Sequence, residues 1–333
     1  MCADSKSLLQ DKSYKKSACG YCGAAQSLYL YPTSSISGDS FHIKRCLRCH
    51  AAFLSPRPTQ KQLDQAYDDI YYGKGDAKYT GFIEKILDYF RSARARTVRR
   101  YIKTPGRILD IGCGNGGFLN YLIKQGFEGH GIELPGKAAQ RAEQIPNLQL
   151  KIGPLTEKDF SEDLFDCICM WHVFEHLTEP QKTLSTIQKI LKPGGYLMMS
   201  LPNFSSIQSK LFRGNWLHLD PPKHLFFLEP PDLISKMKGF GFQLIKLSYF
   251  SLEQNPFGIQ QSILNCLLRQ RDVLFESLKG NNDYTKRYPR FSIALQKLFY
   301  ISSFPLFALL AGFESLLRKG GTMELIFQKT KET

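Results

Sequence analysis

Two pairs of cysteines near the start of the chain have the spacing of metal ligands. Cys19 and Cys22 form one Cys-x-x-Cys pair, and Cys46 and Cys49 form another. Each pair can present two sulfurs to one ion, and four thiolates complete a tetrahedral Zn²⁺ site that has no open position. The segment between the pairs alternates like short strands around a Ser-Gly-Asp turn. We therefore predict a structural zinc ribbon in residues 18–58, with four metal-free thiols as the alternative.

A glycine-rich segment follows an apolar strand pattern further along the chain. Residues 109–117 read LDIGCGNGG and lie where the strand pattern gives way to a helical one. Glycines there let the backbone approach a ligand closely, and the start of the helix offers free N–H groups. Glu133 ends the next strand about 20 residues later, where a carboxylate can accept hydrogen bonds from both hydroxyls of a ribose. The spacing of Gly112, Gly114 and Gly117 also fits a dinucleotide fingerprint, so the loop alone does not choose the nucleotide cofactor.

Histidines and acids follow two later strand patterns. His172, Glu175 and His176 come after the apolar run FDCICMW, and Asp220 and His224 lie in the loop after GYLMMSLPN. Ligands of open α/β sheets bind outside the carboxyl ends of the strands, so these side chains are expected near a bound ligand. We predict that His172 acts as a general base or positioning group. The other four residues are further catalytic candidates.

Other roles compete with these assignments. His176 could cap and pack the following helix, and the loop around Pro221 and Pro222 could be a rigid turn. The string His-x-x-Glu-His also matches a metalloprotease pattern, which needs both histidines on one helix, a further ligand and an open zinc position. Because this string begins in a strand pattern, we reject a protease.

Alternating strands and helices must position these residues. From Arg107 to about residue 250, six short strand patterns alternate with helical ones, which indicates a parallel sheet covered on both faces. A helical pattern in front of the sheet carries the basic run RSARARTVRRYI, and residues 322–330 alternate like a last strand. We predict the following units: a flexible N-terminus 1–17, the zinc-ribbon segment 18–58, a helical cap 59–104, and a catalytic domain 105–333 that contains a helical insertion 251–318.

Together these motifs resemble class I methyltransferases that depend on S-adenosylmethionine (SAM), and in particular a large bacterial family whose members often act in sugar, glycan or natural-product pathways. Residues 110–116 look like the D/E-x-G-x-G-x-G motif of the class, and the strings FDCICMWHVFEHL, LKPGGYLMMSLPN and DPPKHLFFLEPPDLISKMKGFGF resemble this family. The cysteine pairs followed by LSPRPTQKQLDQAY are similar to members of the same group. The resemblance covers roughly residues 18–250 and the last strand. It implies an α/β Rossmann-like fold whose seven-stranded sheet has the order 3-2-1-4-5-7-6, with an antiparallel last strand.

The resemblance also implies a cofactor site built from two strand ends and the glycine loop. Its residues are Asp110 for the amino-acid end of SAM, Gly112, Gly114 and Gly116 for the lining, Glu133 for the ribose and Leu134 for the side of the adenine. Related sequences often have an acid after the third strand, but here the sequence is Gly-Pro-Leu at 153–155. Backbone groups near Leu155, or Glu157, are expected to replace it. Tyr71 and Tyr72 would close over the cofactor, or simply pack.

Charge and apolar patterning bound the surroundings of the protein. The net charge of +14 over 333 residues suggests nucleic acid, lipid head groups or a phosphorylated substrate as neighbours. The first residues lack the apolar core of a secretory signal, so we predict a cytoplasmic protein. The uncharged run 298–313 is interrupted by Pro305 and is shorter than the roughly 20 residues of a spanning helix. We therefore predict a buried or interfacial segment, with 291–317 as a candidate peripheral contact to the inner face of a membrane.

We predict SAM-dependent methyl transfer, most readily to oxygen, on a small-molecule, nucleotide-sugar or lipid-linked glycan acceptor that is anionic or carrier-linked. One alternative is an RNA methyltransferase with a zinc knuckle. No familiar RNA-binding module is visible, and PNFS at 202–205 only partly matches the catalytic tetrad of such enzymes. The sequence is also compatible with a quinone-pathway O-methyltransferase and with a non-catalytic scaffold.

Overall fold

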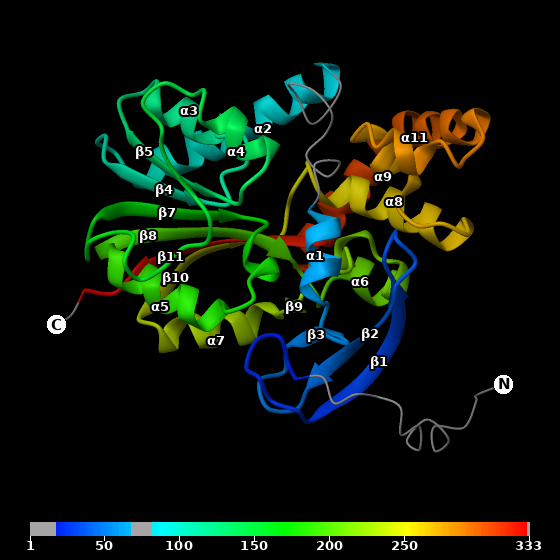
Figure 1. The fold of residues 1–333 in the computed structure, drawn as a ribbon, viewed down its shortest axis with the longest axis horizontal. Coiled ribbons are helices and arrows are strands. Elements are labelled where there is room, and N and C mark those ends of the chain that lie inside the picture. Colours follow the sequence, from blue (N-terminus) through cyan, green and yellow to red (C-terminus); the bar gives the residue numbers. More distant parts are fainter. Residues whose placement is uncertain (1–17, 68–80, 332–333) are drawn as a thin grey trace.

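The computed structural model describes residues 18–67 and 81–331 (Figure 1). Two sheets organise this part of the chain: a seven-stranded sheet of order β10-β11-β8-β7-β4-β5-β6, and a four-stranded sheet of order β1-β2-β3-β9. The central strands are β4 (Arg107–Ile111), β5 (Glu128–Glu133), β6 (Gln149–Ile152), β7 (Phe165–Trp171), β8 (Leu191–Pro202), β10 (Phe242–Ser248) and β11 (Thr322–Lys329). Strand β11 is antiparallel to both of its neighbours, whereas β4, β5, β6, β7 and β8 pair in parallel. Numbered in chain order from β4, the strands follow 3-2-1-4-5-7-6, which confirms the predicted sheet.

Helices cover both faces of the central sheet because alternate residues of its strands point to opposite sides. Ile108 of β4 packs in one apolar cluster with residues of α2 (Gly81–Tyr101) and α3 (Gly117–Ile123). Leu109, its neighbour, packs in another cluster with residues of α5 (Pro180–Ile190) and α7 (Pro230–Gly239). Figure 1 shows α4 (Lys137–Ala142) on the same side as α3.

The small sheet joins the N-terminal segment to a loop from the second half of the chain. Strands β1 (Ser27–Ser34), β2 (Ser40–Cys46) and β3 (Ala52–Ser55) form an antiparallel meander, which α1 (Gln60–Ala66) follows. Its fourth strand, β9 (Phe226–Phe227), belongs to the loop after β8 and pairs with β3. The backbone N–H of Leu54 also donates to the carbonyl of Leu225 at 3.0 Å. The sequence pattern did not predict β9, because a two-residue strand carries no periodicity of its own.

Four helices lie between β10 and β11: α8 (Asn255–Leu267), α9 (Val273–Leu278), α10 (Asn282–Thr285) and α11 (Arg290–Leu316). The expectation that Pro305 interrupts the apolar run is wrong. Helix α11 is 27 residues long and contains Pro305 in its interior. Pro305 removes one hydrogen bond to the carbonyl of Ile301, and that residue is 70% exposed, so water can serve the carbonyl. Of the two predicted alternatives, a buried or an interfacial segment, the buried one is wrong, because only 11% of the most apolar stretch of α11 is buried.

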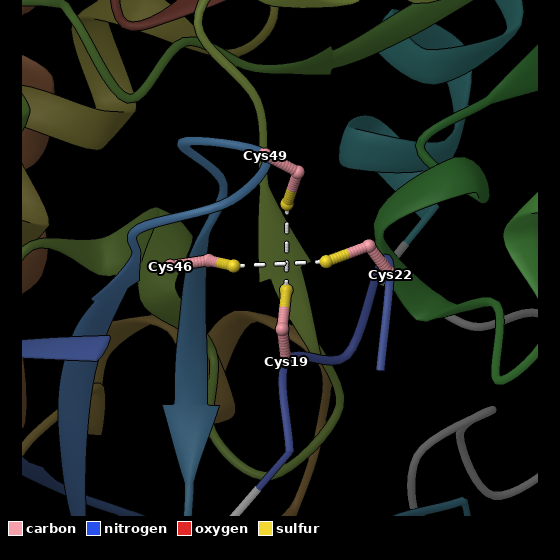
Figure 2. A group of neighbouring side chains, drawn as sticks. All are labelled: Cys19, Cys22, Cys46 and Cys49. Carbon is pink, nitrogen blue, oxygen red and sulfur yellow. Dashed lines mark hydrogen bonds between the residues drawn. The ribbon is translucent and has the colours of Figure 1, made fainter. Parts of the chain in front are cut away.

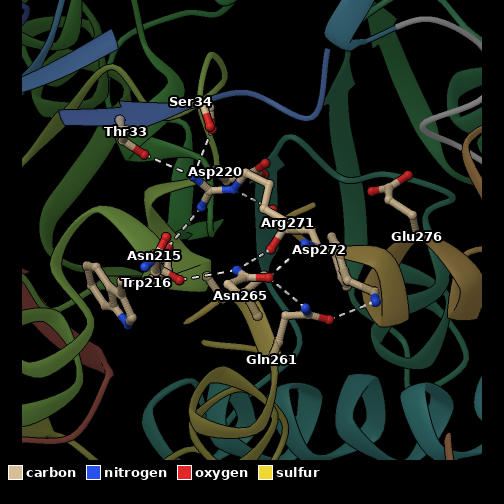
Figure 3. A network of polar contacts seen from close by, with 12 residues as sticks. Thr33, Ser34, Asn215, Trp216, Asp220, Gln261, Asn265, Arg271, Asp272 and Glu276 are labelled. Carbon is tan, nitrogen blue, oxygen red and sulfur yellow. Dashed lines mark hydrogen bonds and ion pairs between the residues drawn. The ribbon is translucent and has the colours of Figure 1, made fainter. Parts of the chain in front are cut away.

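A buried arginine fastens the helical insertion to the small sheet (Figure 3). The guanidinium of Arg271 donates to Thr33 Oγ1 at 2.9 Å and to the carbonyl of Ser34 at 2.8 Å, both on β1. It also donates to the carbonyl of Trp216 at 3.2 Å and to Asp272 Oδ2 at 3.0 Å. Arg271 is 8% exposed, so these contacts lie in a medium where an unpaired group is costly.

Replacing this arginine should destabilise the fold. Arg271→Met leaves Asp272 buried without its cation and removes the donor of four further acceptors, the fourth being the carbonyl of Gly214 at 3.3 Å, which should lower the free energy of unfolding by about 3–5 kcal/mol. Urea denaturation followed by circular dichroism measures the change. The exposed neighbour Arg269 provides a matched control, and Arg269→Met should change the value by less than about 0.5 kcal/mol. Equal losses in the two variants would contradict this account of the network.

Candidate functional site

The glycine loop connects β4 to α3 and has one open side. Gly112, Gly114 and Gly116 have left-handed backbones, with φ of 73°, 59° and 72°. A Cβ at Gly112 would lie 2.5 Å from a methyl carbon of Val173, and one at Gly116 would lie 2.6 Å from a methyl carbon of Ile145. A Cβ at Gly114 would meet nothing within 4 Å. Gly112 and Gly116 are therefore required by the packing of the protein itself, whereas Gly114 faces space that a ligand can fill.

Glu133 closes this loop at the end of the neighbouring strand. Its carboxylate accepts hydrogen bonds from the backbone N–H of Gly114 at 2.6 Å and of Leu134 at 2.9 Å. A carboxylate has about four lone-pair positions, so both oxygens can still accept from two hydroxyls of a ribose. The Leu134 side chain is 44% exposed beside it, which leaves an apolar surface for a flat ring.

Asp110 is a buried carboxylate at the carboxyl end of β4. It is 3% exposed, and its Oδ1 has no hydrogen-bond partner within the described residues. Burial raises the pKa of Asp110 well above its usual range, Glu133 adds to the rise, and the guanidinium of Arg94 opposes it. Charged ligand groups such as an ammonium would compensate this acid. Arg94, on α2, lies 5.5 Å from the centre of the Trp171 ring and pairs with Glu253.

Sequence reasoning missed Arg94 as a residue of the site. It belongs to the basic run in α2, but the sequence does not say which of these arginines turns inward. On the side expected for the adenine, Leu155 is partly buried against the core and Glu157 is exposed, and their contact with the cofactor stays a prediction. Tyr71 and Tyr72 lie outside the described residues.

His172 stands directly after β7 with a left-handed backbone, φ 56°. Its Nδ1 lies 3.5 Å from Glu175 Oε1, and its Nε2 lies 3.0 Å from the hydroxyl of Ser200 on β8. The side chain is 21% exposed, so a ligand can reach the ring. A buried carboxylate on one ring nitrogen leaves the other available to exchange a proton.

Glu175 and His176 lie in a single 3-10 turn (Phe174–His176), which differs from the helix that a metalloprotease motif requires. Burial alone would raise the pKa of Glu175, but the surrounding imidazoles outweigh it and hold the pKa at about 2. Burial, together with the neighbouring His224, lowers the pKa of His176 to about 3. His176 Nδ1 lies 2.7 Å from the Tyr67 hydroxyl, on the turn that follows α1.

The loop after β8 brings His224 to the same place but pairs Asp220 elsewhere. His224 Nε2 lies 3.9 Å from Glu175 Oε1, and the His176 and His224 rings are 4.6 Å apart. Asp220 Oδ2 lies 2.7 Å from Lys223 Nζ. Lys223 and His224 outweigh the effect of burial and lower the pKa of Asp220, so this acid is held by its own loop. The structure thus gathers His172, Glu175, His176 and His224.

The four N-terminal cysteines converge on one point (Figure 2). The sulfurs of Cys19 and Cys49 are 3.6 Å apart, as are those of Cys22 and Cys46, and all four lie within 4.8 Å of one another. A tetrahedral Zn²⁺ site with Zn–S bonds of about 2.3 Å would have edges of about 3.8 Å. Burial raises the pKa of Cys22 to about 11, and a bound cation would reverse that shift. The donor set and its geometry therefore fit a zinc ion.

An open depression of about 600 Å³ lies far from these groups, at the amino ends of the strands. Lys103, Arg107, Asp166 and Lys192 belong to its lining. Ligands of open α/β sheets bind at the opposite, carboxyl edge, so this depression is not the expected cofactor site.

Comparison with known proteins gives the class. Residues 82–247 match the family model of a methyltransferase domain. An uncharacterized methyltransferase of Schizosaccharomyces pombe is 31% identical over 149 residues, which cover 39% of this chain and 51% of that protein. A ubiquinone biosynthesis O-methyltransferase of Alkalilimnicola ehrlichii is 24% identical over 192 residues, covering 55% of this chain and 67% of the relative. A crystal structure of a SAM-dependent methyltransferase from Archaeoglobus fulgidus is 20% identical and superposes with a TM-score of 0.44, over 72% of this chain and 94% of the other.

The chain matches about half of the length of the Schizosaccharomyces pombe relative. The methyltransferase domain match and the order of the central sheet agree, and the chain belongs to the class I SAM-dependent methyltransferases. The prediction of a methyltransferase domain is confirmed. Asp110, Gly114 and Glu133 fit SAM, since an orphaned acid, an open backbone and a ribose-type carboxylate meet at one loop.

A single substitution tests this cofactor site. Glu133→Gln keeps the shape but removes the charge that would hold the ribose hydroxyls, so the Kd for S-adenosylhomocysteine should rise at least about tenfold. Isothermal titration calorimetry measures it, with NAD as a ligand that should not bind. Glu128→Gln, at the half-buried opposite end of the same strand, should leave the Kd unchanged. An unchanged Kd in Glu133→Gln would remove Glu133 from the site.

Proposed function

We propose that the enzyme methylates a hydroxyl group, and that His172 removes the hydroxyl proton. The observation that carries this proposal is the position of His172 between a buried carboxylate, Glu175, and the hydroxyl of Ser200. Glu175 favours the tautomer with a proton on Nδ1, so the Nε2 lone pair accepts from the Ser200 hydroxyl and, when an acceptor hydroxyl takes that place, accepts its proton. The same carboxylate stabilises the imidazolium that forms.

When bound, SAM supplies a methyl group made electrophilic by the adjacent sulfonium. The acceptor oxygen forms the new C–O bond while the C–S bond breaks, and the hydroxyl proton passes to His172 Nε2. Asp110 would hold the ammonium of the amino-acid end, and Glu133 the ribose. The protein contributes alignment of the acceptor and removal of one proton.

The acceptor we favour is an anionic, carrier-linked or lipid-linked glycan, or a nucleotide sugar. The net charge of +14 favours an anionic partner. The ubiquinone O-methyltransferase relatives support oxygen as the acceptor atom and keep a quinone precursor as the second candidate. The methyltransferase domain argues against a non-catalytic scaffold. No observation favours RNA over these smaller acceptors.

Removal of the base should slow the reaction without weakening the binding of the cofactor. His172→Asn suits this test because asparagine tolerates the left-handed backbone, and turnover should fall about 10²–10⁴-fold. The Kd for S-adenosylhomocysteine should stay within about threefold. Transfer from [methyl-¹³C]SAM to glycolipids, nucleotide sugars, quinone precursors and RNA, followed by NMR, identifies the acceptor and the methylated atom. Unchanged turnover in His172→Asn, or a C- or N-methyl product, would contradict the proposal.

We further propose that α11 docks on an anionic membrane surface. Among the described residues, α11 is the one helix long and apolar enough to cross a membrane, judged by length and composition. Its exposed apolar side chains are distributed over the whole helix, most of them three or four residues apart: Phe291, Leu295, Leu298, Ile301, Leu306, Leu309, Leu310, Phe313 and Leu316. Such a surface is larger than single exposed leucines explain, and it marks an interaction site.

Contacts on the inner side of α11 favour lying on the membrane over crossing it. Gln208 Nε2 donates to Glu314 Oε2 at 2.8 Å, and the hydroxyl of Ser315 donates to the carbonyl of Tyr249 at 2.8 Å. These polar contacts tie the helix to the catalytic domain, and insertion across a bilayer would break them.

The charges around α11 favour an anionic membrane surface over a neutral one. Lys286, Arg287 and Arg290 at one end, Lys297 within the helix, and Arg318 at the other end are all exposed. Over residues 280–320 the acids are Asp283, which is exposed, and Glu314, which is buried. This balance complements the negative surface of a cytoplasmic leaflet. It would bring the reaction centre to a lipid-linked acceptor.

Vesicle sedimentation tests the docking. The protein should bind vesicles of phosphatidylglycerol and phosphatidylcholine, and bind pure phosphatidylcholine far more weakly. The double variant Leu298→Gln/Leu309→Gln removes two exposed leucines and should weaken binding at least about tenfold. Leu28→Gln, 54% exposed on β1, is the matched control and should bind normally. Failure of the wild type to bind vesicles would contradict docking on a membrane. A dimer that the double variant abolishes would show that a second copy of the chain covers this face instead.

The four-cysteine cluster supports a further proposal, a structural Zn²⁺ ion. A site with four thiolate ligands has no open position and takes no part in the chemistry. The ion would hold together the two cysteine pairs, of which Cys19 and Cys22 precede β1, and Cys46 and Cys49 lie at or just after the end of β2.

A further inference from the structure

A second group of metal-ligating atoms lies next to His172 and is separate from the cysteines. One carboxylate oxygen of Glu175 and one ring nitrogen each of His176 and His224 lie within 4.8 Å of one another. Glu175 and His224 are buried, and His176 is half-buried. The three residues come from two loops, after β7 and after β8, which meet at the carboxyl edge of the sheet. We propose that these residues bind one divalent transition-metal ion.

Glu175 provides independent evidence for a missing cation. Its side chain is 1% exposed, and neither carboxylate oxygen has a hydrogen-bond partner in the described part of the chain. An anion buried without donors costs several kcal/mol unless a cation compensates it. The imidazoles of His172 and His224 approach it only to 3.5 and 3.9 Å. A metal ion among the three residues would supply the charge directly.

The histidines carry the supporting contacts that metal ligands usually have. His224 Nδ1 lies 2.7 Å from the carbonyl of His218, and His176 Nδ1 lies 3.1 Å from the carbonyl of Lys223. A carbonyl oxygen can only accept a hydrogen bond, so His224 carries hydrogen on Nδ1 and presents the lone pair of Nε2. His176 Nδ1 also lies 2.7 Å from the Tyr67 hydroxyl, a group that both donates and accepts, so only the His224 tautomer follows from these contacts. Ligating histidines characteristically donate their other ring N–H in this way, which fixes the tautomer and the ring. At His224, that lone pair faces the acid oxygen with no proton between them.

The ligand types indicate the class of metal. Two imidazoles and one carboxylate suit Zn²⁺, Co²⁺, Ni²⁺ or Fe²⁺ better than Mg²⁺ or Ca²⁺, which prefer oxygen ligands. Three protein ligands leave at least one open position, as in catalytic sites. That position would lie beside His172, where an acceptor oxygen bound to the ion would lose its proton more readily. This role deepens the proposed O-methylation, whereas the metal site itself does not depend on it.

Titration of the metal-free full chain with Co²⁺ alone tests the site. The wild type should bind two equivalents: one with the intense near-ultraviolet sulfur-to-cobalt bands of thiolate ligation, and one with weak visible bands only. His224→Asn keeps a donor for the His218 carbonyl but loses the Nε2 ligand. It should therefore lose the second equivalent, with at least a tenfold rise in its Kd. Glu175→Gln should do the same and serves if His224→Asn does not fold.

Two controls separate the sites and the functions. Cys22→Ser should lose only the thiolate bands. His218→Asn changes a buried histidine outside the ligand set, and it should keep both equivalents. Absence of the equivalent with weak visible bands from the wild type, or its retention in both His224→Asn and Glu175→Gln, would overturn the proposal. Because the readout is metal binding, it stands apart from turnover, so a different acceptor atom would leave this result unchanged.

Discussion

The pairing of β3 with β9 is the contact on which the arrangement of the site depends. Phe53 pairs with Phe226, and the backbone N–H of Leu225 donates to the carbonyl of Glu175 at 2.9 Å. The Phe226 ring lies 5.6 Å from Tyr21 of the first cysteine knuckle and 5.3 Å from Phe174. A two-residue strand thus connects the sulfur cluster to the turn that carries Glu175. Its few hydrogen bonds are each worth about 1 kcal/mol, so burial of its phenylalanines must supply most of its stability.

Local patterns were sufficient to predict the central sheet and insufficient for the contacts around it. Apolar runs such as Phe165–Trp171 predict buried parallel strands, and the position of the glycine loop indicates which strand lies at the centre of the sheet. Strand β9 exists only because β3 lies beside it, and α11 continues through Pro305 because the affected turn is exposed to water. Both features are decided by surroundings that sequence periodicity does not contain.

The same distinction holds within the site. The sequence identified the glycines by type, yet Gly112 is needed because Val173, sixty-one positions later, packs against it. Asp220 was a reasonable catalytic candidate as an acid in a loop, but Lys223 pairs with it. Arg94 was hidden in a basic run that resembles a solvated helix face. Residue types and their strand positions can be read from sequence, whereas the partner of each charge depends on contacts between distant segments.

Charge also explains how one basic protein can serve a cationic cofactor and an anionic acceptor. Asp110 and Glu175 are both buried at the carboxyl edge of the sheet, and each has a carboxylate oxygen without a hydrogen-bond partner among the described residues. Buried acids of this kind favour positive ligand groups at two points, one beside the glycine loop and one beside His172, because a ligand cation stabilises the ionised form of the acid. The surplus of lysine and arginine acts at longer range and attracts an anionic acceptor to the surface. The buried acids therefore favour what binds inside the site, while the basic surface favours what approaches it.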